Sequence, residues 1–559
     1  MSGSRKKGKE SRIPKVVIVA LAVLLLAAGI WTEVADSKRV STEEVDIVSW
    51  FEGNDGLAVI KDYELKYEPV LYEGGSLYVS TDYLYKELNS RFYYDQEEQK
   101  LLYTLPEGTK TADISTMADG LPVLIMRNQQ AYVYLPYIAQ WTDMTWDLYL
   151  APLRLVVHTD FDRKEQATVK QEVMIRQKAS QKSPILHKLQ AGDSAIVLER
   201  GSEWSRVCTE DGFGGYVRSQ ELGTIIYKTF PHDWYEPVYT DPPKKQKICM
   251  VWDQISNWDD NKHLEEYMAC TEGVNVVAPT WFRTVDSEGN IDSLSDPSYV
   301  EKVHAMGAKV WIVLNNMDNG ITNESLTRLL SRTSSRTRLV NTLIEETLAV
   351  DADGINVDIE GLPSAAGPGF IQFIRELSVE AHAAGLTVSA DNYVPSAWSM
   401  HYFRAEQAVM LDYFVIMGYD EHYSGSDAGS TASLGFVRKG VEDTLREVPA
   451  EKIINGVPFY SRLWKGYGST LSSSLLSMNA IQRYIRDYEL SPIWDAECGQ
   501  SFAQFSIGGV TARLWVEDAD SMTARLNALK EYKLGGLAFW RVGLETESIW
   551  ETISAYYKS

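Results

Sequence analysis

Cysteine and histidine are scarce in this chain, which has 4 cysteines and 8 histidines among 559 residues. Cys208, Cys249, Cys270 and Cys498 lie too far apart for a zinc-binding motif, and no histidine cluster accompanies them. Four cysteines are also too few to make a disulfide scaffold in a chain of this length. We therefore expect free thiols, with a Cys249–Cys270 bridge left open, and neither a bound metal nor a cofactor.

Positive charge is also scarce, with 54 Lys and Arg against 77 Asp and Glu and a formal net charge of −23. An acidic body argues against nucleic acid as a partner, and against retention on an anionic cell wall by charge alone. The apolar and charged fractions are ordinary for globular protein, so disorder is not indicated. The length predicts two to four domains, each with an ample core.

The first 31 residues differ from the rest. Residues 1–15 carry six basic side chains against one acid, and residues 16–31 are uncharged and mostly aliphatic. A basic segment before an apolar run indicates export, with the tail left in the cytoplasm. We expect residues 16–31 to anchor the protein in the cell membrane with its domains outside the cytoplasm. Because the run is shorter than the roughly 20 residues of a comfortable spanning helix, a cleaved signal peptide and secretion stay open.

Two small accessory domains are predicted next. Residues 45–160 contain a weak internal repeat of strand, short helix and two strands, and resemble the α+β stalk domain found at the N-terminus of copper amine oxidases. Residues 167–223 change to short alternating strands, and their Gly-Asp, Trp-x-x-Val and Gly-Tyr-Val segments resemble a bacterial SH3-like β-barrel. The resemblances imply a spacer and a wall-contact or positioning module. Pro231–Lys247 is typical of a linker.

From residue 247 to 559, short apolar strands alternate with longer helical stretches. Eight strands with intervening helices predict a (β/α)8 TIM barrel of the α/β class, with chemistry at the carboxyl ends of the strands. The stretch Ser461–Lys533 is expected to carry an inserted subdomain. The expected strands are Ile248–Val251, Val274–Ala278, Lys309–Leu314, Gly354–Ile359, Thr387–Ala390, Tyr413–Met417, Ile453–Val457 and Gly536–Phe539.

The fourth expected strand is polar on one face. Because successive side chains of a strand point to opposite faces, Gly354, Asn356, Asp358 and Glu360 share one face and apolar residues cover the other. An ordinary parallel strand is apolar on both faces. Burying polar groups is costly unless they are paired or used, so this ladder predicts a reactive site ending in Glu360. The alternative is an edge strand with a solvated polar face.

Four motifs follow one another in a recognisable order. Asp353–Glu360 reads Asp-Gly-Ile-Asn-Val-Asp-Ile-Glu, and Met417–Asp420 reads Met-Gly-Tyr-Asp. Gly456–Arg462 reads Gly-Val-Pro-Phe-Tyr-Ser-Arg, and Gly535–Trp540 ends the last expected strand. Together they resemble glycoside hydrolase family 18, whose patterns are Asp-Gly-x-Asp-x-Asp-x-Glu, Met-x-Tyr-Asp and Gly-x-Pro-x-Tyr-x-Arg.

Two departures narrow this resemblance. Asn356 stands where the family has Asp, and Leu314-Asn315-Asn316 stands where it has Ser-x-Gly-Gly. With these departures and the accessory modules, the chain resembles the spore-cortex and peptidoglycan N-acetylglucosaminidase branch more than the main chitinases.

The resemblance implies one acid and the substrate's own 2-acetamido oxygen as nucleophile, where most retaining glycosidases use two carboxylates. Glu360 would protonate the leaving oxygen. Asp358 would accept the acetamide N–H, stabilise the oxazolinium cation and raise the pKa of Glu360 through its charge. Tyr419 would donate to the acetamide carbonyl.

Other residues are expected to bind substrate or to support the ladder. Asn356 would hydrogen-bond Asp358, Asp420 would bind sugar hydroxyls, and Trp540 would stack beneath the sugar ring. Asn392 is a further candidate for sugar contact. Structural roles stay open for Tyr419, Asp420, Trp540 and Asn392. Tyr460 and Arg462 match a motif without an assigned role, and Trp252, Trp258 and Trp281 either line the groove or pack in the core.

The expected activity is retaining hydrolysis of β-1,4 bonds in glycans that contain N-acetylglucosamine, peptidoglycan first and chitin second. The expected partners are that polysaccharide, the cell wall and, through the N-terminal helix, the membrane. The alternatives are a chitinase, a lectin-like sugar-binding barrel without hydrolysis, and a structural wall protein whose accessory modules matter most. Lectin-like relatives typically replace the terminal glutamate, which is present here as Glu360.

Overall fold

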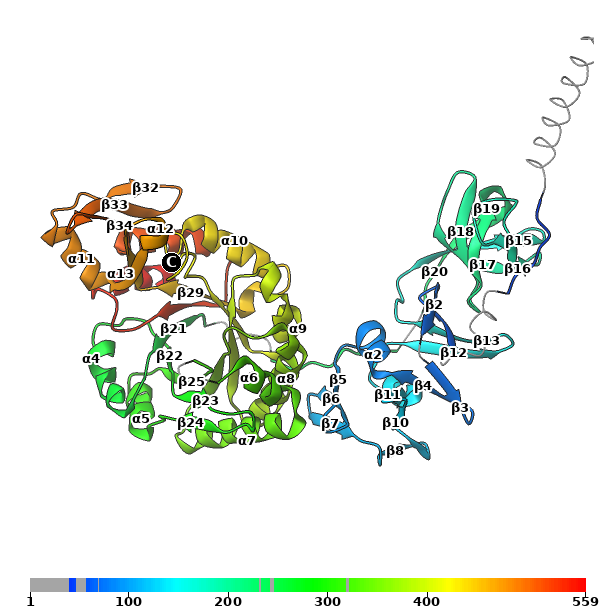
Figure 1. Cartoon of the computed structure of the whole chain (residues 1–559), viewed down its shortest axis with the longest axis horizontal. Helices are drawn as coiled ribbons and strands as arrows, with labels where there is room; N and C mark the ends of the chain where they lie inside the picture. The colour runs from blue at the N-terminus through cyan, green and yellow to red at the C-terminus, as the bar shows by residue number, and fades with distance from the viewer. Residues whose placement is uncertain are drawn as a thin grey trace, which may run out of the picture. The chain divides into compact units, whose positions relative to one another are not determined.

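The computed structural model describes six ranges of the chain: 40–46, 57–68, 70–230, 233–241, 246–317 and 321–558. The basic tail and apolar run expected at residues 1–31 lie outside these ranges. No helix within them is long and apolar enough to cross a membrane, and the expected anchor stays a prediction. The described residues divide into two compact units, one within Met1–Asn89 and Met117–Tyr235 and the other within Ser90–Thr116 and Glu236–Ser559 (Figure 1).

The second unit is built around eight parallel strands. Their order is β22-β21-β35-β29-β28-β27-β26-β25, and β22 pairs with β25 to close the ring. The barrel expected from the sequence is confirmed, and each strand ends within three residues of its expected position. The strands are β21 (Ile248–Asp253), β22 (Val276–Pro279), β25 (Lys309–Asn315), β26 (Gly354–Asp358), β27 (Thr387–Tyr393), β28 (Tyr413–Met417), β29 (Ile453–Pro458) and β35 (Gly536–Trp540).

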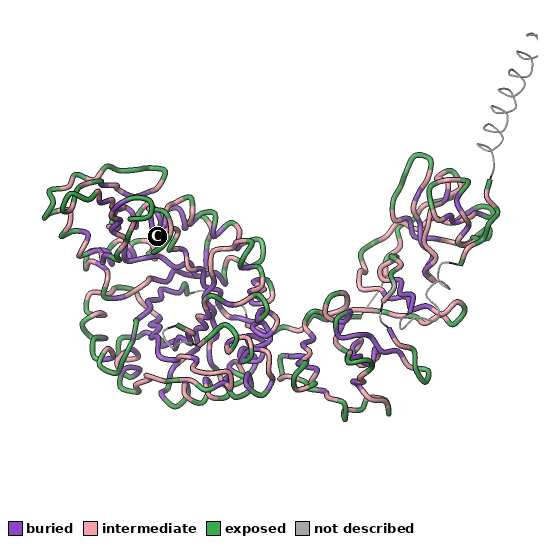
Figure 2. Tube along the Cα trace, in the orientation of Figure 1, coloured by how far each residue is buried: buried purple, intermediate pink, exposed green. Residues whose placement is uncertain are grey.

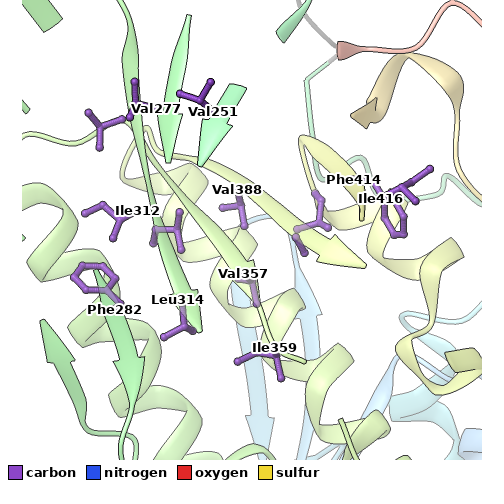
Figure 3. Packing of buried hydrophobic residues seen from close by; sticks show 14 of the residues in the cluster. Val251, Val277, Phe282, Ile312, Leu314, Val357, Ile359, Val388, Phe414 and Ile416 are labelled. Atoms are coloured by element: carbon purple, nitrogen blue, oxygen red, sulfur yellow. The ribbon is translucent and has the colours of Figure 1, made fainter. Parts of the chain in front are cut away.

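Helices surround the barrel, and the alternation of side chains along each strand separates two cores. Val357 of β26 packs with Leu314 and Val388 of the neighbouring strands in the layer between strands and helices (Figure 3). The inner faces contribute a separate cluster that includes Trp252 and Trp311. Figure 2 shows burial concentrated along these strands. The helices are α4 (Leu264–Met268), α5 (Pro297–Ala305), α6 (Asn323–Ser331), α7 (Thr333–Ala349), α8 (Gly367–Ala383), α9 (Arg404–Met410), α10 (Leu434–Thr444), α12 (Ala519–Lys530) and α13 (Ile549–Lys558).

Two small additions extend the barrel. The hairpin β23 (Phe282–Thr284) and β24 (Ile291–Ser293) joins the sheet beside β25. The insertion expected within Ser461–Lys533 is a five-stranded antiparallel sheet in the order β31-β30-β34-β33-β32, with one helix packed on it. Its elements are β30 (Tyr460–Lys465), β31 (Ser472–Ser477), α11 (Met478–Asp487), β32 (Ile493–Asp495), β33 (Gln500–Ile507) and β34 (Val510–Val516).

A segment that the sequence assigns to the stalk-like domain packs on the barrel. Strands β5 (Phe92–Asp95), β6 (Lys100–Leu105) and β7 (Gly108–Ala112) form a small sheet within the second unit. Gln372 of α8 donates a hydrogen bond to Thr104 Oγ1 at 3.1 Å, so β6 is fixed to a barrel helix. The catalytic-barrel boundary expected at residue 247 therefore leaves out a part of this unit.

The expected linker is partly ordered against the same unit. Tyr239 is buried, and its hydroxyl donates to the carbonyl oxygen of Thr104 at 3.0 Å. The ammonium of Lys452 donates to Thr240 Oγ1 at 2.8 Å. Residues 236–241 are thus held by side-chain contacts, while residues 242–245 lie outside the described ranges.

The first unit contains the rest of the expected stalk-like domain and the SH3-like barrel. Two four-stranded sheets, β12-β13-β1-β2 and β10-β11-β4-β3, make up the stalk-like part, and seven strands in the order β16-β15-β19-β18-β17-β14-β20 follow. All four cysteines of the chain are free. The elements are β1 (Leu57–Lys61), β2 (Glu64–Glu68), β3 (Val70–Glu73), β4 (Ser76–Ser80), α2 (Thr81–Tyr83), β10 (Leu124–Arg127), β11 (Gln130–Tyr134), α3 (Leu135–Ala139), β12 (Thr145–Leu150), β13 (Leu153–His158), β14 (Lys164–Val169), β15 (Val173–Arg176), β16 (Ile185–Leu189), β17 (Ser194–Glu199), β18 (Trp204–Cys208), β19 (Gly214–Arg218) and β20 (Leu222–Lys228).

Candidate active site

The polar ladder of β26 lies beside a second polar ladder on β27. The two strands are parallel, and Asn356 is opposite Ser389 in their register. Because side chains alternate along both strands, Asp358 and Asp391 follow two residues later on the same inner face. Asp391 was missed in the sequence, although its position two residues after Ser389 is the signal that could have found it.

Asn356 joins the two ladders. Its Nδ2 donates to Ser389 Oγ at 3.0 Å and to Asp391 Oδ1 at 2.8 Å. Its Oδ1 accepts a long hydrogen bond of 3.4 Å from the indole N–H of Trp252. Both amide hydrogens are therefore directed to β27, and the predicted hydrogen bond from Asn356 to Asp358 is not formed. Asp358 Oδ1 is sealed from solvent without a hydrogen-bond partner among the described residues.

Glu360 is held at the end of β26 by three neighbouring groups. The Tyr393 hydroxyl donates to Glu360 Oε2 at 2.8 Å. The Asn316 amide binds the backbone on both sides, donating to the Glu360 carbonyl at 2.8 Å and accepting from its N–H at 2.9 Å. Tyr402 donates to the preceding carbonyl, that of Ile359, at 3.1 Å. The carboxyl group is thus fixed at the mouth of the barrel by Tyr393 and by its own backbone.

Burial dominates the electrostatics of the three carboxyl groups. No ion pair with Asp358, Glu360 or Asp391 is formed within the described ranges. Burial, then the charges of Asp391 and Glu360, hold the pKa of Asp358 well above its usual range. Burial and, further out, the charge of Asp420 raise the pKa of Glu360 against the lowering effect of the Tyr393 hydrogen bond. The predicted rise in the pKa of Glu360 agrees in direction, but it comes from burial and the Asp420 charge and not from the Asp358 charge expected from the sequence.

Asp391, the carboxyl group on β27, also has a raised pKa. Burial raises the pKa of Asp391 to about 7, against the hydrogen bond from Asn356, with the Glu360 charge raising it further and Trp252 lowering it. Like-charged carboxyl groups in a shared low-dielectric site titrate as a coupled set, so the ladder holds protons near neutral pH.

Aromatic rings surround this ladder. The Tyr419 ring lies 6.5 Å from that of Trp540 in a stacked arrangement and 6.2 Å from that of Trp252 in an edge arrangement. Trp540, at the end of β35, keeps part of its surface exposed, whereas Trp252 and Trp281 are buried in the core. Trp258 is exposed. The structure therefore brings Tyr419 and Trp540 together beside the carboxyl groups, and leaves an open aromatic face at Trp540.

Asp420 lies at the rim and is oriented by the two residues that the sequence left without a role. The Tyr460 hydroxyl donates to Asp420 Oδ1 at 2.7 Å, and the Arg462 guanidinium lies 3.6 Å from the same oxygen. The Asp420 backbone has a φ of 56°, in the left-handed region that Asp tolerates better than most residues. Its partly exposed carboxylate is thus available to a ligand.

Two predicted or motif residues lie elsewhere. Asn392 is buried on the outer face of β27, where its amide exchanges hydrogen bonds of 2.9 and 3.0 Å with Gln407 of α9. The structure does not bring it to the ladder. Asp353, the first acidic residue of the motif, lies at the opposite end of β26 and accepts hydrogen bonds from His304, Lys309 and the Val310 N–H. Asp353 therefore ties β26 to β25 and to α5.

The described residues contain no group of three or more His, Cys, Asp or Glu side chains that could hold a metal ion. The chemistry available at the ladder is proton transfer and hydrogen bonding by carboxyl, amide and phenol groups, with an aromatic surface beside them.

Comparison with known proteins matches both the barrel and the SH3-like region. The family model of glycosyl hydrolases family 18 matches residues 281–545, and that of the bacterial SH3 domain matches residues 172–223. A protein of Bacillus subtilis named as a sporulation-specific glycosylase is 29% identical over 239 residues, covering 42% of this chain and 57% of its own length. The cortical fragment-lytic enzyme of the same organism is 27% identical over 256 residues, covering 44% and 59%.

The chain thus spans less than two thirds of the length of these two relatives. The crystal structure of the Bacillus cereus spore cortex-lytic enzyme matches with a TM-score of 0.52 and 18% identity, covering 59% of this chain and 78% of that one. At that identity the likeness bears on the fold alone. From the ordered motifs, the closed barrel and the two family matches, we conclude that this chain carries a glycosyl hydrolase family 18 domain preceded by a bacterial SH3 domain.

Proposed function

We propose that the barrel is a retaining glycoside hydrolase that cleaves β-1,4 linkages of glycans containing N-acetylglucosamine, with peptidoglycan as its substrate. The observation that carries this proposal is the grouping of Glu360, Asp358 and Tyr419 at the carboxyl ends of the barrel strands. Glu360 has a raised pKa and a fixed carboxyl group, as a general acid at neutral pH requires.

In this proposal Glu360 protonates the leaving glycosidic oxygen while the acetamide oxygen of the substrate attacks the anomeric carbon. Family 18 enzymes use this substrate-assisted route, which needs one protein acid and a device to hold the acetamide. The Asp358 carboxylate accepts the acetamide N–H. Tyr419 donates to the acetamide carbonyl, and Trp540 stacks beneath the sugar. The oxazolinium intermediate is then opened by water, with Glu360 as base, so configuration is retained.

Peptidoglycan is favoured over chitin by two features outside the barrel chemistry. Relatives over this domain are named as cortex-lytic and sporulation glycosylases. The bacterial SH3 domain at residues 172–223 suits a module that holds the enzyme on the wall. Export fits the same substrate, and we propose that residues 1–31 deliver the domains to the outer side of the membrane, as anchor or as signal peptide.

The test compares the full-length chain with Glu360→Gln and, as a matched control, Glu442→Gln. Glu442 accepts a hydrogen bond from Tyr532 on the surface, outside the ladder. Each protein is incubated with purified peptidoglycan and with chitin oligosaccharides. New reducing ends are reduced with borohydride and identified by mass spectrometry. Reduced N-acetylglucosamine ends from peptidoglycan, produced by the wild type and the control but not by Glu360→Gln, are the expected result.

Other outcomes separate the alternatives. Fragments from chitin only would make the protein a chitinase. Binding of both glycans by wild type and Glu360→Gln without cleavage of either would favour a lectin-like barrel. Excision of residues 164–228 tests whether the SH3 domain holds the protein on the wall. If the shortened protein is still retained on the wall, another part of the chain binds it. A deletion that included Ser90–Thr116 would disturb the barrel unit and would not test the SH3 domain alone.

A further inference from the structure

The ladder contains a carboxyl group that the proposed chemistry has not used. Asp391 on β27 is 4% exposed, faces the barrel interior and is bound by Asn356 at 2.8 Å. Asn356 occupies the position at which the family motif has a second acid on the strand that carries the general acid. Two carboxyl groups therefore lie behind Glu360: that of Asp358 on β26 and that of Asp391 on the neighbouring strand β27.

The two carboxyl groups are unequally supplied with hydrogen bonds. Asp391 Oδ1 accepts a hydrogen bond from Asn356, which stabilises its ionised form. Asp358 Oδ1 is sealed from solvent and accepts none from the described residues. Two adjacent buried carboxyl groups without a cation cannot both ionise at low cost. In the empty site the shared proton therefore rests on Asp358, and Asp391 is the ionised partner.

Substrate reverses this preference. An acetamide N–H that docks on the Asp358 carboxyl group supplies a hydrogen-bond donor and stabilises its carboxylate, which must be ionised to face the oxazolinium cation. We propose that Asp391 is the proton acceptor that makes this change: the proton of the Asp358 carboxyl passes to the Asp391 carboxylate when the acetamide docks, and returns when product leaves. The inference rests on the proposed function and makes Asp391 a positioning residue acting through Asp358. No other reactant is needed, because one O–H bond breaks as another forms.

The surroundings of Asp391 are consistent with this exchange. The groups that face it are Asn356, Asp358 and Glu360 from β26 and its end, Tyr419 beyond β28 and Trp252 of β21. Only carboxyl and phenol groups among these titrate. Because burial raises the pKa of Asp391 to about 7, it can accept a proton near neutral pH.

The experiment measures the pH dependence of kcat/KM for the full-length chain on a fluorogenic diacetylchitobioside and on peptidoglycan. Activity requires ionised Asp358, so it rises with pH through the pKa of that group. Asp391→Asn removes the charge that raises this pKa, and the acid limb should move to lower pH by about one unit or more. Asn356→Asp adds a carboxyl group and should move the limb to higher pH. The double variant Asn356→Asp/Asp391→Asn restores two carboxyl groups and should return the limb toward the wild-type position.

Ser389→Ala is the matched control, because it removes the other hydrogen bond of Asn356 without removing a carboxyl group. Its acid limb should coincide with that of the wild type, whatever its effect on rate. The inference would be overturned if the acid limb of Asp391→Asn coincided with that of the wild type. It would also be overturned if the double variant had the same acid limb as Asp391→Asn. Neither result would contradict the proposed hydrolase activity.

A second readout keeps the inference testable if the wild type cleaves neither glycan, which would be a failure of the proposed function alone. Infrared spectra of the protein follow the C=O stretch of protonated carboxyl groups during a pH titration. The wild type should show a buried carboxyl group that titrates near pH 7, and Asp391→Asn should lack it. An identical titration in both proteins would contradict a shared proton at Asp391.

Discussion

The Asn316 side chain forms two hydrogen bonds with the backbone of Glu360: its Nδ2 donates to the Glu360 carbonyl oxygen at 2.8 Å, and its Oδ1 accepts from the Glu360 N–H at 2.9 Å. Asn316 directly follows β25, the strand that pairs with β26 along its length. The residue therefore fixes the point at which the chain leaves β26, and with it the direction of the Glu360 side chain.

Asn316→Ala should reduce kcat by about 100-fold with little change in folding, because a displacement of about 1 Å at the reacting group costs that much. Asn316→Asp keeps the acceptor but loses the donor and should fall between wild type and Asn316→Ala. Asn323→Ala, an exposed substitution at the start of α6, is the control. Steady-state kinetics on chitin oligosaccharides give the comparison, and a kcat within about twofold of wild type for Asn316→Ala would contradict a positioning role.

Tyr393→Phe should extend activity to higher pH. The Tyr393 hydroxyl donates to the Glu360 carboxylate and lowers its pKa. Glu360 acts in its protonated form, so activity is lost as pH rises through its pKa. Removing the donor raises that pKa further, and the alkaline limb of kcat/KM should move up by about one unit, since a hydrogen bond to a charged group is worth roughly 1.5–3 kcal/mol.

Tyr402→Phe is the matched control for Tyr393→Phe. Its hydroxyl binds the Ile359 carbonyl and the Leu362 N–H, next to Glu360 but not at the carboxylate. We expect a lower kcat with a smaller change in the alkaline limb. Equal shifts for both variants would mean that the limb reports general loosening of the loop.

The barrel and the β26 side of the site could be predicted because they depend on local patterns. Apolar runs with regular spacing mark the parallel strands, and alternation places Asp358 and Glu360 on one face whatever the rest of the fold. The apolar residues Val357 and Ile359 lie in the outer layer as expected (Figure 3).

The β27 side was missed because the strand was expected to end at Ala390. It continues through Asp391 and Asn392 to Tyr393. The apolar periodicity of this strand ends where its inner-face residues become polar. Because these polar residues belong to the site, the apolar pattern does not mark the part of the strand that carries them. Asn392 follows the expected end of this strand, where the sequence does not determine the face, and it lies on the outer face against Gln407.

The docking of Ser90–Thr116 on the barrel could not be predicted from local sequence. Within the repeat, β5 and β6 correspond to β12 and β13, and the two pairs have the same pattern. Only tertiary contacts distinguish them: β12 and β13 pair with β1, whereas β5 and β6 join the second unit.

Asp95→Ala should destabilise α7 although the two lie more than 230 residues apart in the chain. The N-cap residue of α7, Arg332, makes no side-chain capping bond. Asp95 Oδ2 takes that role, accepting from the Thr333 N–H at 2.6 Å and from its hydroxyl at 2.7 Å. Loss of an N-cap of this kind costs about 1–2 kcal/mol.

Native-state hydrogen exchange at the amides of α7 is the suitable measurement, because a multidomain chain does not unfold in one step. Asp113→Ala is the control from the same segment, since Asp113 binds only its local turn through Ser115 and Thr116 in the described contacts. Faster exchange in α7 with Asp95→Ala alone is expected. Equal protection in both variants would show that α7 is held without this cap.

Glu517 and Arg525 form an ion pair with 0% and 1% of their side chains exposed, at N–O distances of 2.9 and 3.0 Å. Removing one partner leaves a buried charge, so Glu517→Leu and Arg525→Leu should each cost about 3–5 kcal/mol. The double variant leaves no unpaired charge and should lose clearly less than the sum of the singles. Urea unfolding of the barrel transition, followed by tryptophan fluorescence, measures this coupling. Arg525→Leu also breaks the contact with Ala432, and Glu517→Leu also breaks the contacts with Gln500 and Ser521. Additive losses would mean that these other contacts outweigh the charge pairing itself.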